Sequence, residues 1–259
     1  MTTNRITRPQ SGFTLTELTI VLVIVALLIG GMLVPVSAQK DLQNTTEAKK
    51  QLSDINDALL GFAAAQGRLP CPATAISLGQ ESFCTNATGA CGAELTVAQT
   101  HGRCFDFFNG FVPAATLGLS PTNSQGFAID PWGNQLRYAV SNKAAGLIEF
   151  PFTKTAGIKA VWAVDPSPLQ TALLRICAHI TGSDCPAEDR ITDGAVVVLF
   201  STGKNGGATP VSADELANWT SSGDRVFVSA TPSAAFDDLV TWNSPNILFN
   251  RMISAGRLP

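Results

Sequence analysis

One acidic residue at the edge of a long apolar run is the most chemically suggestive group in the sequence. Glu17 comes directly before Leu18–Val36, nineteen residues in which Thr19 has the only polar side chain. A carboxylate in hydrocarbon costs at least about 2.5 kcal/mol at the bilayer centre, and less near an interface. Because opposite charges attract strongly in a medium of low dielectric constant, we expect a cationic partner for Glu17. The alternative is that Glu17 only reaches out to the water interface.

The apolar run itself predicts a membrane helix. About 20 apolar residues span a bilayer, which places the span at about residues 15–36. Arg5 and Arg8 precede it without any acidic residue, so the N-terminus should stay in the cytoplasm and the remainder should be exported. A plain signal anchor, or a signal peptide cut after Ala38, is the alternative, although the apolar core is longer than signal peptides usually have.

A short motif precedes the apolar run. It reads Gly12-Phe13-Thr14-Leu15-Thr16-Glu17. This motif resembles the processing site of type IV prepilins and type II secretion pseudopilins, in which a membrane peptidase cuts after the glycine and methylates the new N-terminus. The resemblance implies a leader at residues 1–12, a mature protein that begins at Phe13, and Glu17 as the fifth mature residue. The freed amine of Phe13 is then the cation that Glu17 of a neighbouring subunit would neutralise.

The resemblance also implies partners and a place in the cell. The partners are other pilin or pseudopilin subunits, the prepilin peptidase and N-methyltransferase, and the inner membrane. The protein would be a single-pass inner-membrane protein with its C-terminal head in the periplasm, and later part of a periplasmic or surface filament.

Helical spacing continues beyond the membrane segment. Apolar residues recur on one face at Leu52, Ile55, Leu59 and Phe62. Gly67 and Pro70 then form a helix stop, so we expect one helix over residues 13–66, roughly 80 Å long. Together with the resemblance, this predicts an α+β, pilin-like fold. Its long N-terminal helix, with a membrane half and an amphipathic half, would pack on an antiparallel β-sheet head, residues 67–259, with disulfide-tied loops.

The head sequence predicts short elements. Apolar segments between turn residues indicate strands at Leu136–Val140, Leu147–Phe150, Ile158–Val164, Ala195–Phe200 and Arg225–Ser229. We expect a helix at Leu173–Ile180 and a closing helix at Asn246–Ala255, after Ser244 and Pro245. Asp130-Pro131-Trp132-Gly133 resembles a turn that leads into a strand in pseudopilin heads.

Six cysteines all lie beyond the apolar run: Cys71, Cys84, Cys91, Cys104, Cys177 and Cys185. Export would place them in an oxidising compartment, where an even number fits disulfides with fifteen possible connectivities. Local spacing favours Cys177–Cys185, and we expect Cys84–Cys91 nested inside Cys71–Cys104. Zinc is a weak alternative, because there is no Cys-x-x-Cys and there are only two histidines.

A glycine-rich segment, residues 201–207, resembles the loop that binds calcium in the major pseudopilin. Its candidate ligands are Ser201, Gly203, Asn205, Asp214 and Glu215. Calcium takes six to eight oxygen ligands, and these residues could supply several. Lys204 and the distant position of Asp237-Asp238 argue against the site, and the alternative is a glycine-rich turn between strands. We expect no cofactor other than this calcium ion.

The composition and the motifs of the sequence argue against several classes of function. The net charge is −3 and only 14% of residues are charged, which gives no basic surface for nucleic acid. The sequence has no Gly-x-Ser-x-Gly, no phosphate-binding loop and no His-Glu-x-x-His, so we do not expect an enzyme. The predicted function is that of a structural subunit of a type IV pilus or secretion pseudopilus. The large head favours a minor subunit.

Two alternatives come from other classes. The first is a signal-anchored periplasmic module for binding or adhesion. The second is an anchored enzyme, which would need a polar pocket around His101 or His179.

Overall fold

The computed structural model describes residues 12–144, 149–164, 173–182, 184–206, 212–219 and 225–259, apart from the side chains of residues 30–38. Contacts divide the chain after Asn44 into two units. One helix, α1 (Leu15–Gln66), begins in the first unit and ends in the second.

The first unit contributes apolar side chains that are not covered. Large apolar residues from Leu18 to Ile29 are all exposed, and because they follow one another closely they point to every side of the helix. Among the described residues, no helix has a stretch that is both long enough and apolar enough to cross a membrane. The predicted span reaches into residues 30–38, whose side chains lie outside the described residues.

In the second unit, α1 is amphipathic. Its buried residues form one stripe at Ala48, Leu52, Ile55, Leu59 and Ala63. Gly67 ends the helix with a left-handed φ of 72°, and its N–H donates to the Ala63 carbonyl at 2.8 Å. This is the glycine stop that the sequence predicts.

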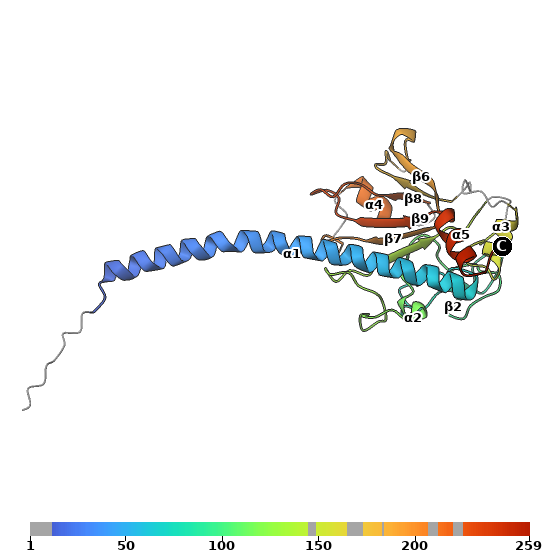
Figure 1. The fold of residues 1–259 in the computed structure, drawn as a ribbon, viewed down its shortest axis with the longest axis horizontal. Helices are drawn as coiled ribbons and strands as arrows, with labels where there is room; N and C mark the ends of the chain where they lie inside the picture. The colour runs from blue at the N-terminus through green and yellow to red at the C-terminus, as the bar shows by residue number, and fades with distance from the viewer. Residues whose placement is uncertain (1–11, 145–148, 165–172, 183, 207–211, 220–224) are drawn as a thin grey trace, which may run out of the picture. The chain divides into compact units, whose positions relative to one another are not determined.

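A four-stranded antiparallel sheet lies beside this part of the helix (Figure 1). Its order is β3 (Gly110–Phe111), β4 (Arg137–Val140), β7 (Val197–Ser201) and β9 (Leu239–Asn243). The Tyr138 hydroxyl donates to the Pro70 carbonyl at 3.0 Å, and Asn243 hydrogen-bonds to Asn56 of α1. Since side chains alternate between the faces of a strand, α1 covers the face that carries Tyr138 and Asn243.

A second, three-stranded sheet has the order β6 (Arg190–Ala195), β5 (Leu174–Cys177) and β8 (Val226–Val228). β5 is antiparallel to β6 but parallel to β8, so the head is not purely antiparallel. The rings of Phe200 and Phe227 lie 5.9 Å apart, which places this sheet against the face of the first sheet that α1 does not cover. Helix α4 (Ala213–Trp219) packs on β8.

One stretch of chain belongs to both sheets. Only Val196 separates β6 from β7. Its N–H donates to the Asn243 carbonyl at 2.8 Å, and its carbonyl accepts the N–H of Ser141 at 2.9 Å. The backbone therefore passes from one sheet to the other while it remains hydrogen-bonded.

Short elements complete the second unit. They are the antiparallel pair β1 (Phe83–Cys84) and β2 (Glu94–Leu95), helices α2 (Ala114–Leu117), α3 (Gly157–Val164) and α5 (Pro245–Ser254), and the 3₁₀ turn η2 (Ala187–Asp189). The structure forms the disulfides Cys71–Cys104, Cys84–Cys91 and Cys177–Cys185. The predicted pairing, with one bridge nested inside another, is confirmed.

Two predicted elements are wrong. The segment Ile158–Val164 is not a strand but belongs to helix α3, in which Gly157, Ile158 and Val161 are buried at helical spacing. The segment Leu173–Ile180 is not a helix. It contains strand β5, in which Leu174 and Ile176 are buried and Arg175 is half-buried. Short apolar segments do not distinguish a helix from a strand, and here the neighbouring strands β6 and β8 decide.

The other element predictions have mixed outcomes. Strands β4, β7 and β8 and helix α5 lie where the sequence predicts them, within two residues at each end. Strand β9 was not predicted. Residues 147–148 of the expected strand Leu147–Phe150 lie outside the described residues.

Candidate functional site

The first candidate site is the start of α1. Thr14 precedes the helix, and its hydroxyl donates to Glu17 Oε2 at 2.8 Å, while its N–H donates to the same oxygen at 3.0 Å. The Glu17 N–H in turn donates to the Thr14 hydroxyl at 3.3 Å. This reciprocal arrangement is a capping box, in which each side chain satisfies an N–H that the helix leaves unpaired. Glu17 therefore stabilises the start of its own helix.

The predicted processing site lies directly before this cap. Gly12 and Phe13 adopt no regular secondary structure, and the Phe13 side chain is 91% exposed. The peptide bond between them belongs to an extended, accessible segment rather than to the helix.

The second candidate site lies at the loop that leaves β7. The Ser201 hydroxyl donates to Asp130 Oδ2 at 2.6 Å. Asp130 Oδ1 accepts the N–H groups of Trp132 and Asn134, at 3.0 and 2.8 Å. The Asn134 amide donates to the Gly203 carbonyl at 2.6 Å. The turn at Asp130–Gly133 and the loop after β7 therefore hold each other in place.

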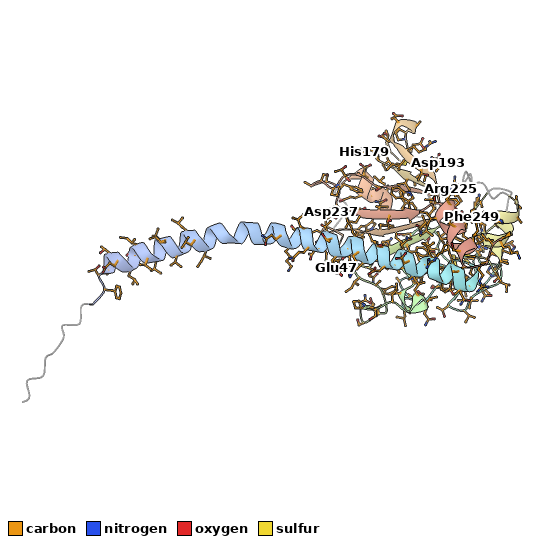
Figure 2. The ribbon with its side chains drawn as sticks, viewed as in Figure 1. Glu47, His179, Asp193, Arg225, Asp237 and Phe249 are labelled. Atoms are coloured by element: carbon orange, nitrogen blue, oxygen red, sulfur yellow. A yellow bond between two sulfur atoms is a disulfide. The ribbon has the colours of Figure 1, made fainter. Side chains whose placement is uncertain are left out.

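Three carboxylates converge beside this loop. Glu215 comes from α4, whereas Asp237 and Asp238 precede β9, and Figure 2 labels Asp237 there. Carboxylate oxygens of the three residues lie within 4.8 Å of one another. Glu215 and Asp238 are buried, and Asp237 is half-buried.

Backbone and amide donors already occupy part of this cluster. Asp237 Oδ2 accepts the N–H groups of Lys204 and Asn205, at 2.8 and 3.1 Å. Glu215 Oε1 accepts the Asn205 amide at 2.9 Å and the Asp237 N–H at 3.2 Å. Asp237 Oδ1 is buried without a hydrogen-bond partner, so at least one oxygen of the cluster remains available to a cation.

Burial and the repulsion between neighbouring carboxylates raise the pKa values of Asp237 and Asp238. Burial raises the pKa of Asp238 to about 7, and the nearby charges of Glu215 and Asp237 add to the effect, while a hydrogen bond from Asn218 opposes it. Burial also raises the pKa of Asp237, against the opposing N–H donors of the loop. Three adjacent carboxylates are all ionised only at a cost, which a bound cation or proton reduces.

Gly203 explains why the loop needs a glycine at this position. Its φ is +63°, and a Cβ atom there would lie 2.4 Å from the Asp237 carbonyl oxygen. A larger residue would push the loop away from the Asp237 backbone and disrupt the cluster.

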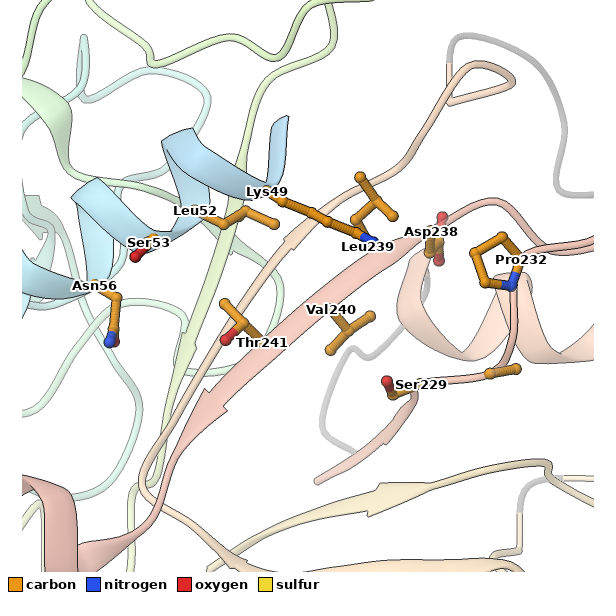
Figure 3. Close-up of a pocket in the computed structure, with 11 residues that line it drawn as sticks. Lys49, Leu52, Ser53, Asn56, Ser229, Pro232, Asp238, Leu239, Val240 and Thr241 are labelled. Atoms are coloured by element: carbon orange, nitrogen blue, oxygen red, sulfur yellow. The ribbon is translucent and has the colours of Figure 1, made fainter. Parts of the chain in front are cut away.

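Asp238 also borders a cavity of about 400 Å³ between α1 and β9 (Figure 3). Lys49 and Leu52 of α1 line one wall, and Leu239 and Val240 of β9 line another. Asp238 therefore belongs both to the carboxylate cluster and to the lining of this cavity.

Comparison with protein families addresses the first site. Residues 7–33 match the family model for the prokaryotic N-terminal methylation motif. The match supports a type IV pilin-like chain and is confined to its N-terminal segment. No curated protein and no solved structure matches the chain.

The structure brings together most, but not all, of the predicted loop residues. Ser201, Gly203, Asn205 and Glu215 all contribute to the loop or to the carboxylate cluster. Asp214 does not, because it accepts hydrogen bonds from His179 Nδ1 and the Ile180 N–H, both at 2.9 Å. The bond to Asp214 raises the pKa of His179.

Sequence reasoning took the distant position of Asp237 and Asp238 as an argument against the site, but the structure brings both into the cluster. The signal was an adjacent acidic pair, but its position depends on β9 lying antiparallel to β7. Ser201 at the end of β7 then pairs with Leu239 at the start of β9, so the residues before β9 meet the loop after β7. The capping box was missed, although Thr-x-x-Glu before an apolar run is its signature.

The two histidines lie in different surroundings. His101 Nδ1 accepts the N–H of Arg103 at 3.0 Å, whereas His179 is exposed and pairs with Asp214. Neither lines the cavities of about 400, 370 and 350 Å³ that described residues form.

Proposed function

We propose that this chain is a minor subunit of a type IV pilus or a type II secretion pseudopilus. Its precursor would cross the inner membrane once, with the head in the periplasm, and assembly would move the apolar helix from lipid into the filament. The observation that supports this most strongly is the exposed apolar start of α1 with a single carboxylate at its edge. Such a surface requires lipid or other helices to cover it.

The geometry of Glu17 suggests how the subunits pair. Its Oε2 atom is engaged in the capping box, whereas the described residues place no hydrogen bond on Oε1. One oxygen would therefore cap the helix while the other accepts the methylated amine of Phe13 from a neighbouring subunit. In a medium of low dielectric constant this contact would fix the axial register.

The N-terminus of the mature protein tests the proposed processing. Mass spectrometry of the chain purified from cells should give a polypeptide that begins with N-methylated Phe13. An intact Met1 in the functioning protein would contradict the proposal and favour a signal-anchored periplasmic module for binding or adhesion.

Two matched variants separate the charge of Glu17 from its capping role. Glu17→Gln keeps an acceptor oxygen but loses the charge, so we expect normal processing and at least roughly tenfold lower incorporation into filaments, which corresponds to about 1.4 kcal/mol. Thr14→Ala weakens the cap by about 1 kcal/mol but keeps the charge, so its incorporation should stay near wild type. Equal incorporation of Glu17→Gln and wild type would remove charge pairing from the mechanism.

Copy number tests the minor role. Quantitative mass spectrometry of purified filaments should find this chain far below the main subunit. If the chain proved to be the main component, the minor role would be wrong while the filament role would stand.

We also propose that the head binds calcium at Glu215, Asp237 and Asp238. Support comes from the convergence of the three carboxylates and from the unpartnered Asp237 Oδ1. Calcium prefers carboxylate and carbonyl oxygens, and it would offset the repulsion within the cluster. The ion would supply structural order to the loop rather than chemistry.

A further inference from the structure

The loop that follows β7 also lines a second polar cavity. Its volume is about 370 Å³, within the range of small-molecule sites. The cavity is lined by Thr202 from the loop, by Gln135 and Arg137, which follow the Asp130–Gly133 turn, and by Trp219 from α4. The cavity shares none of the three carboxylates of the cluster.

Arg137 gives this cavity a positive charge, and no carboxylate among the described residues forms an ion pair with it. Its guanidinium stacks on Phe111, with 4.7 Å from Cζ to the ring centroid, and Nη2 donates to Asn109 Oδ1. The Nε atom is buried and has no hydrogen-bond partner. Burial lowers the pKa of Arg137, whereas the negative charge of Asp106 raises it. Asp106 does not form an ion pair with Arg137, so it acts from more than 4 Å away.

Arg137 is half-buried, and a partly desolvated cation without a nearby counter-ion is costly. Among the described residues, no carboxylate lies within 4 Å of the Arg137 guanidinium. An anionic ligand in the cavity would supply the missing partner. Because Asp106 already offsets part of the positive charge, a singly charged carboxylate suits the site better than a doubly charged phosphate.

The remaining walls suit a body that carries hydroxyl groups. Trp219 presents an indole that is 38% exposed at the rim. The Asn123 Oδ1 atom accepts two backbone N–H groups, but hydrogen bonds within the described part of the chain use neither the Asn123 NH₂ group nor the Gln135 amide. Free amides bind hydroxyl groups, and an exposed indole face packs against the C–H groups of a ring.

We propose that this cavity binds a carboxylate-bearing sugar. The carboxylate would accept hydrogen bonds from the terminal nitrogens of the Arg137 guanidinium, the ring would lie on Trp219, and its hydroxyl groups would bond to Asn123 and Gln135. The subunit would then present an acidic-glycan site in its head, in addition to its proposed role in a filament.

Titration of the full-length chain in detergent micelles, labelled with [¹⁵N]tryptophan, tests this directly. The chain has only four tryptophans, and Trp219→Phe identifies the indole signal of Trp219. Sodium glucuronate should shift this signal in a saturable way, with at least roughly tenfold higher affinity than glucose or sodium acetate. Equal affinity for acetate would contradict the sugar, equal affinity for glucose would contradict the carboxylate, and no shift would overturn the site.

Variants test whether Arg137 supplies the positive charge that binds the ligand. Arg137→Gln should weaken glucuronate binding by roughly 10- to 100-fold, or about 1.4–2.7 kcal/mol. The matched control, Arg190→Gln, removes a surface arginine that pairs with Asp193 and should not change the affinity. Unchanged binding in Arg137→Gln would overturn the proposal. If Arg137→Gln does not fold, the comparison of glucuronate, glucose and acetate on the wild-type chain decides. Inorganic sulfate that binds as tightly as glucuronate would also contradict the proposal.

Discussion

Asp238 illustrates how a single buried side chain can link acidity, cation binding and stability. It is 5% exposed, its Oδ2 atom accepts one hydrogen bond from Asn218 at 2.8 Å, and two other carboxylates lie beside it. The folded protein therefore holds a proton on Asp238 to a higher pH than the unfolded chain does.

In the absence of divalent cations, the stability of the head should fall as the pH rises from about 4 to about 7. The pKa of Asp238 is raised to about 7, so in this window the folded state binds more protons than the unfolded state, and unfolding becomes easier with rising pH. The loss from this group should be roughly 4 kcal/mol at most. Urea unfolding in EGTA at several pH values measures it, and a curve that rises throughout this window would argue against the raised pKa.

Calcium should counteract the loss of stability that the head shows as the pH rises. At pH 7.5, a calcium concentration near 100 times the dissociation constant should stabilise by about 2.7 kcal/mol, which raises the melting temperature by roughly 5–10 °C. At pH 5 the effect should be much smaller, because Asp238 is then protonated. Asp237→Asn should abolish the response in thermal melts, whereas Asp193→Asn, at an exposed ion pair, should retain it. A response that survives Asp237→Asn would place the ion elsewhere.

At the scale of elements, the end of α1 is fixed to the disulfide-tied loops by a buried ion pair. The Arg68 guanidinium donates to the two Glu81 oxygens at 2.7 and 2.8 Å. It lies over the rings of Phe62 and Phe83, at 5.3 and 5.5 Å from their centroids. Glu81 also accepts the Cys71 N–H at 3.3 Å, so one carboxylate joins the helix end to the first disulfide.

Breaking this pair on one side should be costly. Glu81→Gln leaves a buried guanidinium without its counter-charge, and we expect a loss of roughly 3–5 kcal/mol in the free energy of unfolding. The double change Arg68→Met with Glu81→Leu should cost less than the sum of the single changes, because no charge is then left unpaired. Arg175→Gln, at a pair that is partly exposed to solvent, should cost less than about 1 kcal/mol. Similar losses for Glu81→Gln and Arg175→Gln in urea unfolding would contradict this account.

At the scale of the whole molecule, the three disulfides close loops of very different length. Cys71–Cys104 encloses a separation of 33 residues, whereas Cys177–Cys185 encloses a separation of 8. The longer bridge removes more conformational freedom from the unfolded chain.

Removing each bridge by paired serine substitution should therefore have unequal effects. We expect a loss of roughly 4 kcal/mol for Cys71→Ser with Cys104→Ser, and roughly 2.5 kcal/mol for Cys177→Ser with Cys185→Ser. Urea unfolding of both double variants against the oxidised parent gives the comparison. A larger loss for the shorter loop would show that native contacts, rather than chain entropy, decide the effect.

Local signals in the sequence predicted the features that depend on neighbouring residues. Gly67 ends α1, Pro245 begins α5, and the inner disulfide Cys84–Cys91 joins cysteines that are close in sequence. The methylation motif is equally local, which is why a short stretch was enough to recognise it.

Features that depend on distant segments were not predictable in the same way. The segments that form α3 and β5 are short and apolar, so their state depends on what packs against them. The cluster of Glu215, Asp237 and Asp238 forms only because β9 pairs with β7. That the Arg137 Nε atom has no hydrogen-bond partner among the described residues is visible only once its surroundings are known.

The strand that runs from β6 through Val196 into β7 has a mechanical consequence. Neither sheet can separate from the head without displacing backbone that continues directly into the other sheet. Heat should therefore melt the two sheets in one cooperative step, and calorimetry of the head should record a single peak whose calorimetric and van't Hoff enthalpies agree. A load applied to either sheet would be shared along this common strand rather than concentrated where the sheets meet.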